Sequence, residues 1–167
     1  MNTLLRSFLP VINTRTRILV IGSMPGEASL QAEQYYAYKH NQFWTLMFDL
    51  FENGRIPHDY PDKLHTLLKH RIGLWDALSS CYRPGSLDSR ITKPLPNDFP
   101  ALFKKYPQVR TLLFNGQTAA KYFLRFYKKE LTGKNYYVLP STSPAHASLS
   151  YAQKREQWQQ ALQSQYT

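Results

Sequence analysis

Residues that could bind a polar ligand or organise a hydrolysis follow four short apolar segments of this chain. The glycine-containing segment 22–26 follows the first, and Asp76, Asn115 and segment 140–146 follow the other three. Because parallel strands end side by side at the carboxyl edge of a sheet, these residues are expected to form one pocket. Its amide, hydroxyl and carboxylate groups could read the edge of a ligand or orient a water molecule.

Several other chemistries find no support in the sequence. Segment 22–26 lacks the glycine spacing of a dinucleotide-binding loop and the Gly-Lys-Ser/Thr ending of a P-loop. No Gly-x-Ser-x-Gly elbow is present, which argues against a serine hydrolase built from Ser143, His146 and Asp76. The single cysteine, Cys81, excludes an internal disulfide and any four-cysteine metal site, and a small buried residue is expected there. No metal and no cofactor are expected.

The hydrophobic pattern predicts the elements that position this pocket. Short apolar runs predict strands, and apolar residues at helical spacing predict helices. Strands are expected at 18–21, 74–78, 109–114 and 136–139, and helices at 29–38, 43–52, 63–69, 101–106, 117–129 and 151–163. Strands that alternate with helices favour an α/β fold with a parallel sheet and helices on both faces.

The remaining segments are expected to connect these elements. Residues 1–16 are predicted to be a lead-in broken at Pro10, and residues 79–90 a long polar loop, of a kind that often carries function. No repeat, linker or low-complexity tract is present. A single domain over 1–167 is therefore expected.

The charge of the chain favours a polyanionic partner. It has 21 Lys and Arg against 11 Asp and Glu among 167 residues, a net charge of +10 at pH 7. Nucleic acid leads the candidate partners, although basic charge alone does not decide this. No apolar run approaches the roughly 18 residues that a membrane span needs, and no signal-peptide pattern opens the chain. A soluble, cytoplasmic protein is expected.

Taken in order, the motifs of the chain resemble the uracil-DNA glycosylase superfamily, most closely its hypoxanthine-DNA glycosylase branch. Each motif is weak alone, but their order at successive strand ends is specific. The resemblance covers about residues 17–150 and rests on Gly22-Ser23-Met24-Pro25-Gly26, Tyr35-Tyr36, Asn41-Gln42-Phe43-Trp44, Leu74-Trp75-Asp76, Gly85-Ser86-Leu87-Asp88-Ser89, Phe114-Asn115-Gly116 and Pro140-Ser141-Thr142-Ser143-Pro144-Ala145.

This resemblance implies a three-layer α/β/α domain around a mainly parallel four-stranded sheet. It implies a monofunctional repair enzyme that flips a deaminated base, hypoxanthine or uracil, out of DNA and hydrolyses its N-glycosidic bond to leave an abasic site. A monomer that acts on DNA is expected. Two alternatives stay open: a mismatch-specific uracil-DNA glycosylase, and an inactive member of the fold that only binds nucleic acid.

Met24 departs from the pattern of other branches of the superfamily. There, Asp or Asn at the matching position places the attacking water, which a thioether cannot do comparably. The hypoxanthine branch also lacks that residue, and its essential asparagine matches Asn41. Asn41 is therefore the expected catalytic residue, orienting water for attack on an oxocarbenium-like sugar. The alternative role of Asn41 is an N-cap of the helix that begins near Phe43.

The pocket for the flipped base is expected to include Gly22, Ser23, Met24, Tyr36 and Asp76. Tyr36 matches the family's stacking aromatic, and an ordinary position on a helix surface is the alternative. Asp76 matches a base-reading position, where its carboxylate could accept hydrogen bonds from purine N–H groups or balance charge. Capping of the next turn is the alternative for Asp76.

The DNA backbone is expected to meet Ser141, Thr142, Ser143 and Ala145, which match the family's second motif, and also Arg83. Ser141 stands where several branches carry a histidine that stabilises the departing base anion. A hydroxyl is a weaker donor, so this stabilisation must be distributed or less demanding.

Two further residues lie in these motifs and are not assigned to the site. Asn115 is expected to form a turn with Gly116. His146 could contact phosphate or the base stack, or could be an ordinary loop histidine.

Overall fold

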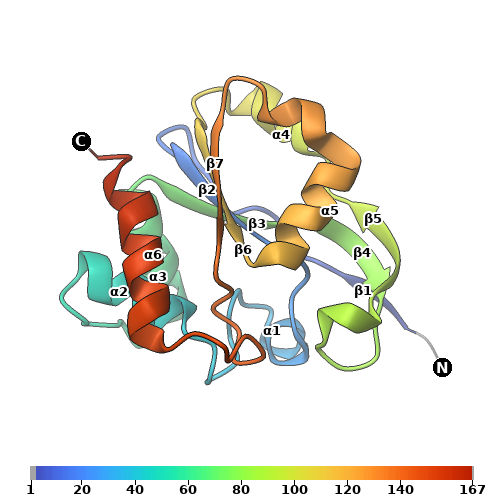
Figure 1. Ribbon diagram of the computed structural model, residues 1–167, viewed down its shortest axis with the longest axis horizontal. Coiled ribbons are helices and arrows are strands. Elements are labelled where there is room, and N and C mark those ends of the chain that lie inside the picture. Colours follow the sequence, from blue (N-terminus) through green and yellow to red (C-terminus); the bar gives the residue numbers. More distant parts are fainter. Residues whose placement is uncertain (1–2, 167) are drawn as a thin grey trace.

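The computed structural model describes residues 3–166, and a four-stranded parallel sheet forms its centre (Figure 1). The strands are β2 (Ile18–Gly22), β3 (Ile72–Asp76), β6 (Thr111–Asn115) and β7 (Asn135–Leu139), in the order β3-β2-β6-β7. Every neighbouring pair is parallel. All four segments predicted as strands contribute to this sheet, although the second, predicted over 74–78, spans 72–76.

Helices cover both faces of this sheet, which confirms the expected three-layer α/β/α architecture (Figure 1). Side chains of a strand point alternately to its two faces. In β2, Ile18 and Val20 therefore pack into one core, whereas Leu19 and Ile21 pack into the other. The first core contains α2 (Phe43–Phe51), α3 (Tyr60–Lys69) and α6 (Tyr151–Gln163), and the second contains α4 (Phe99–Lys105) and α5 (Gln117–Tyr127).

The long helices form where the apolar spacing predicts them. α2 has an amphipathic pattern whose buried members are Phe43, Trp44, Leu46, Met47 and Phe48. α6 begins at a capping box, in which Ser150 and Gln153 each accept the other's backbone N–H. None of the helices described here combines the length and the apolar content of a membrane span.

A second, antiparallel sheet corrects two sequence predictions. It consists of β1 (Leu4–Arg6), β4 (Leu78–Tyr82) and β5 (Thr92–Pro96), in the order β1-β4-β5. The predicted lead-in over 1–16 thus contains a strand, and the predicted loop over 79–90 begins with one and holds the short 3-10 helix η1 (Asp88–Arg90). β5 was not predicted because it contains prolines. An edge strand tolerates proline, because the position that lacks an N–H can face away from the sheet.

The chain between α1 and α2 corrects a third prediction. The helix expected over 29–38 is only α1 (Glu27–Ala32). A similar shortening occurs later in the chain, where the helix expected over 117–129 ends at Tyr127 and passes into the 3-10 helix η2 (Lys128–Leu131). Glu33 and Tyr36 have positive φ angles of 53° and 56°. A left-handed residue cannot continue a right-handed helix, so Tyr36 lies in a turn after α1.

The strand order places a topological switch point between β2 and β6. From β2 the chain moves outward to β3, whereas from β6 it moves outward to β7 on the other side. The loops that follow β2 and β6 therefore diverge. In α/β proteins the resulting crevice at the carboxyl edge is where ligands bind.

Candidate active site

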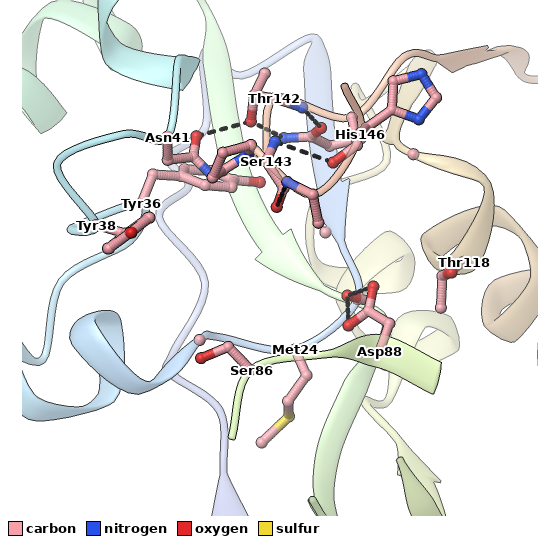
Figure 2. A pocket seen from close by; sticks show the side chains of 18 of the residues that line it. Met24, Tyr36, Tyr38, Asn41, Ser86, Asp88, Thr118, Thr142, Ser143 and His146 are labelled. Carbon is pink, nitrogen blue, oxygen red and sulfur yellow. Dashed lines mark hydrogen bonds between the residues drawn. The ribbon is translucent and has the colours of Figure 1, made fainter. Parts of the chain in front are cut away.

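A cleft of about 1050 Å³ opens at the carboxyl edge of the parallel sheet. Each parallel strand contributes its last residue to the lining, namely Gly22, Asp76, Asn115 and Leu139. Figure 2 shows two facing groups of side chains, with Asn41, Thr142, Ser143 and His146 opposite Met24, Ser86 and Asp88. Of the residues predicted for the site, all except Arg83 line this cleft.

The floor of the cleft is built around Gly22, which pairs with Asp76 in the register of β2 and β3. A Cβ atom at Gly22 would stand 2.5 Å from Oδ1 of Asp76 and 3.1 Å from the hydroxyl oxygen of Tyr36. Glycine therefore lets the carboxyl group and the phenol approach each other over the end of β2.

Tyr36 forms an aromatic wall of the cleft and does not lie on a helix surface. Its ring centroid is 4.2 Å from that of Phe43, with the planes inclined by 31°. Burial, and then the charge of Asp76, raise the pKa of Tyr36 well above its ordinary value, although the Asn115 side chain opposes this shift. Tyr36 is therefore a neutral phenol with a supported ring.

Asp76 is a buried carboxyl group with one oxygen that has no partner among the described residues. The residue is 4% exposed, and its Oδ2 has no hydrogen bond to any described residue. Burial, and then the charge of Asp88, raise the pKa of Asp76 to about 7, whereas Arg83 acts in the opposite direction. The unpaired Oδ2 caps no turn among residues 3–166, and the Asn97 side chain donates instead to the Asp76 backbone carbonyl, at 2.7 Å.

The loop after β2 directs Ser23 and Met24 to different surroundings. The Ser23 hydroxyl lies 2.9 Å from both carboxylate oxygens of Asp88 and donates to them. Met24 is 7% exposed and packs with Leu78 and Cys81, which is buried as expected. The thioether lines the cleft but cannot polarise water, so the group that does so must come from another segment.

Thr142 connects Asn41 to Asn115 through a chain of hydrogen bonds, of which Figure 2 shows the bond between Thr142 and Asn41. The N–H of Thr142 donates to Oδ1 of Asn115 at 2.9 Å, which turns the Asn115 amide nitrogen toward the Thr142 hydroxyl, 3.0 Å away. That hydroxyl accepts from Asn115 and donates to Oδ1 of Asn41 at 2.8 Å. The Asn115 side chain therefore anchors the loop after β7, a role that the predicted turn with Gly116 did not include.

These bonds fix the orientation of the Asn41 amide. Its Oδ1 also accepts the N–H of Phe43, the first residue of α2, at 2.9 Å. Both lone pairs of Oδ1 are then used, and the described residues offer no acceptor to Nδ2. The N-cap of α2 is Gln42, so the N-cap alternative for Asn41 is wrong; Asn41, one residue earlier, still stabilises the start of α2 through Phe43 and presents an amide donor.

The segment after β7 forms a wall stiffened by its own serines. The N–H of Ser143 donates to the Ser141 hydroxyl at 3.1 Å, and the N–H of Ala145 donates to the Ser143 hydroxyl at 3.2 Å. The buried Lys154 of α6 supports this wall by donating to the Ser143 carbonyl at 3.4 Å. Each serine keeps its O–H free to donate, as a contact with phosphate requires.

Arg83 does not lie where a contact with DNA was predicted. Its side chain is 6% exposed, with Nη2 donating to the Pro25 carbonyl at 2.6 Å and Nε donating to the Gly85 carbonyl at 2.8 Å. A guanidinium held in this way ties the loop after β2 to the loop after β4. Its sequence context, a basic residue in a polar loop, gave no sign of burial.

Sequence reasoning missed the contribution of Asp88 and the connecting role of Thr142. Asp88 belongs to a quoted motif, but its partner Ser23 lies 65 residues earlier in the chain, a distance over which spacing carries no information. Among the described residues, no group of three or more His, Cys, Asp or Glu side chains could hold a metal ion.

Comparisons with known proteins agree with this geometry. The family model described as the uracil DNA glycosylase superfamily matches residues 9–164. A hypoxanthine DNA glycosylase of Methanosarcina acetivorans is 37% identical over 153 residues, 90% of this chain and 94% of that protein. One of Methanosarcina barkeri is 34% identical over 117 residues, 70% and 74% of the two chains. A solution NMR structure from M. acetivorans, described as a candidate uracil DNA glycosylase, has a TM-score of 0.82 and 34% identity, covering 99% of this chain and 100% of that one.

Proposed function

The chain belongs to the uracil DNA glycosylase superfamily, and from this premise we propose that the base it removes is hypoxanthine. It is a DNA glycosylase, an enzyme of base-excision repair. Both curated relatives bear the name hypoxanthine DNA glycosylase, which supports this substrate. The protein acts on DNA, and we propose that it does so as a monomer, because one chain supplies every wall of the cleft.

The fixed orientation of Asn41 is the observation that carries the mechanism. With Oδ1 occupied by Thr142 and Phe43, the Nδ2 group is a preorganised donor that can hold the oxygen of the attacking water. Departure of a base from deoxyribose is expected to give an oxocarbenium-like sugar, so the water needs position more than deprotonation. An amide can therefore replace the carboxylate that Met24 does not provide.

The floor of the cleft supplies the groups that hold the flipped base. Tyr36, backed by Phe43, offers a ring face for stacking. Asp76 lies beside its hydroxyl and reads the hydrogen-bonding edge of the purine. Gly22 lets Asp76 and Tyr36 approach the base together, and Ser23 lines the cleft beside them.

The wall after β7 holds the DNA backbone. Ser141 and Ser143 donate hydroxyl protons to phosphate, Thr142 positions the loop, and Ala145 at the exposed tip faces the minor groove. Contacts of this kind fix the position of the flipped nucleotide relative to the Asn41 amide. They carry no information about the neighbouring bases.

The test is an alkali-nicking assay on end-labelled duplexes that carry one hypoxanthine, one uracil or neither. We expect wild-type protein to nick the hypoxanthine strand only after alkali, which marks an abasic product without lyase action. Preferential nicking at uracil would favour the second candidate substrate, a base named in the description of the similar NMR structure. No product from either base, with DNA binding that weakens as salt rises, would leave a nucleic-acid-binding protein.

Thr142→Val is expected to lower the rate of hypoxanthine release by roughly 10²-fold, because it removes the hydroxyl that fixes the Asn41 amide. Thr142→Ser keeps that hydroxyl and is expected to stay within about tenfold of wild type. Single-turnover rates with enzyme in excess make this comparison. Equal loss in both variants would show that the methyl group, and not the hydrogen bond, matters.

Gly22→Ala is expected to abolish detectable release, because its Cβ would lie 2.5 Å from Oδ1 of Asp76 and displace the carboxyl group. Overpacking of this kind also costs about 1–3 kcal/mol of unfolding free energy. Gly26→Ala is the matched control in the same loop, since its Cβ would lie 3.4 Å from the Ser86 hydroxyl. Denaturant unfolding and nicking assays on both variants test this, and an active Gly22→Ala protein would contradict it.

A further inference from the structure

Asp76 is a buried carboxyl group in the cleft with an unpaired oxygen, and no step described so far uses its proton. Three buried side-chain polar atoms lack a hydrogen-bond partner among residues 3–166, on Gln42, Asp76 and Arg83, and of these residues only Asp76 lines the cleft. Buried polar atoms are normally paired, and an unpaired carboxyl oxygen is costly. The atom therefore points to a ligand that completes its hydrogen bonding.

The charge of the cleft restricts how a base can leave. Among the described residues that line the cleft there is no Lys or Arg, whereas Glu27, Asp76 and Asp88 are present; His146, on the wall after β7, is the titratable imidazole among them. Ser141 offers only a neutral hydroxyl where an imidazole would stabilise an anion. An anionic purine formed between these carboxyl groups would be repelled, so the base must gain a proton as it departs.

Burial, and then the charge of Asp88, favour the protonated form of Asp76. Asp88 approaches from the loop after β4, and Tyr35, Tyr36 and Tyr60 are near enough for Asp76 to raise the pKa of each. Among residues 3–166, the charge of Arg83 acts in the opposite direction and favours the carboxylate. Burial raises the pKa of Asp88, and the Ser23 hydroxyl, which bonds both of its oxygens, opposes that shift.

We propose that Asp76 is the general acid of the reaction and protonates a ring nitrogen of hypoxanthine as the base leaves, an inference that rests on the proposed function. The C1′–N9 bond breaks, and its electron pair stays on N9. The Asp76 proton goes to another nitrogen of the purine, which departs as a neutral molecule. Water held by Asn41 forms the new bond to C1′ and releases a proton to solvent, and solvent reprotonates Asp76. The products are hypoxanthine and an abasic sugar.

Asp76 and Asp88 then have different roles in the reaction. Negative charge on Asp88, which the Ser23 hydroxyl supports, favours the proton on Asp76, and Asp76 delivers that proton. Environments that separate the protonation of two neighbouring carboxyl groups are a recurrent way to run acid catalysis near neutral pH.

The experiment measures single-turnover release of hypoxanthine from about pH 5 to pH 9 with enzyme in excess. We expect the wild-type rate to be level at acid pH and to fall tenfold per pH unit above about pH 7, as the acid loses its proton. Asp76→Asn is expected to be about 100-fold slower at acid pH and to show no such fall. Asp62→Asn, the same change at an exposed position of α3, is the control and is expected to match wild type.

Asp88→Asn provides a second, independent readout. Removal of the neighbouring negative charge stabilises ionised Asp76, so the inflection of the rate profile is expected to move to lower pH. A carboxyl ¹³C titration of wild-type protein should show Asp76 with the same inflection as the rate.

The outcomes separate the two levels of the proposal. No release of hypoxanthine at any pH would refute the proposed function itself. Release that is flat or rises with pH in wild type, or an Asp76→Asn protein within tenfold of wild type, would refute the general acid and leave the function standing. An inflection that persists in Asp76→Asn would assign the proton to another group.

Discussion

Asn41→Ala is expected to lower the rate of hypoxanthine release by about 1000-fold, because it removes the amide donor that holds the attacking water. The donor is preorganised by two bonds to Oδ1, from the Phe43 N–H at 2.9 Å and the Thr142 hydroxyl at 2.8 Å. Loss of one preorganised donor at a reacting centre typically costs roughly 10²- to 10³-fold. Single-turnover nicking of a hypoxanthine duplex measures this loss.

Asn41→Asp is the control that separates the Nδ2 donor from the Oδ1 acceptor. Aspartate keeps the oxygen that accepts from Phe43 and Thr142 but puts a second oxygen in place of Nδ2. We expect Asn41→Asp to be as inactive as Asn41→Ala while its unfolding free energy stays within about 0.5 kcal/mol of wild type. Asn41→Ala should lose about 1 kcal/mol, because the Phe43 N–H loses the side-chain oxygen that accepts from it. An active Asn41→Asp protein that binds DNA normally would remove the amide from the mechanism.

Asp76→Asn is expected to make the folded protein more stable at alkaline pH while it impairs release. Folding raises the pKa of Asp76 from 3.8 to about 7, chiefly through burial. Above pH 3.8, Asp76 loses its proton in the unfolded chain but keeps it in the folded protein. The stability of the wild-type protein therefore falls as the pH rises toward the folded pKa of Asp76. Above that value the penalty is constant, on the order of 4 kcal/mol.

The quantity to measure is the change with pH in the unfolding free energy of Asp76→Asn relative to wild type. The buried asparagine amide also lowers stability, but by an amount that does not change with pH. The stability of Asp76→Asn relative to wild type should increase by about 2–3 kcal/mol from about pH 5 to about pH 8. Urea unfolding at both pH values measures it, with Asp62→Asn as the exposed control. A difference that does not depend on pH would mean that Asp76 is ionised in the folded protein at neutral pH.

Elements with a local and periodic signal were predictable from the sequence. The four parallel strands, and the helices that became α2, α5 and α6, bury apolar side chains at spacings that are visible along the chain. β1 and β5 were not predicted, because short edge strands with exposed or proline residues derive their stability from pairing with β4.

The membership of the cleft was also largely predictable, since the carboxyl ends of parallel strands meet at one edge. Arg83 was the exception. Its charge suggested a contact with phosphate, but two backbone carbonyls of neighbouring loops enclose the guanidinium. Whether a long basic side chain is buried or exposed depends on the segments that pack over it in the fold. The neighbouring residues in the sequence do not show this.

The sequence by itself determined the α/β architecture, the edge at which the site lies and the residue types available there, because hydrophobic periodicity and strand-end composition are local properties. Only the tertiary structure decided how those residues act. Thr142 reaches Asn41 across 101 residues and turns its amide, and β3 packs beside β2 so that Asp76 is buried next to Gly22. Orientation and protonation depend on partners brought together by strand order, and the spacing of residues along a chain does not encode them.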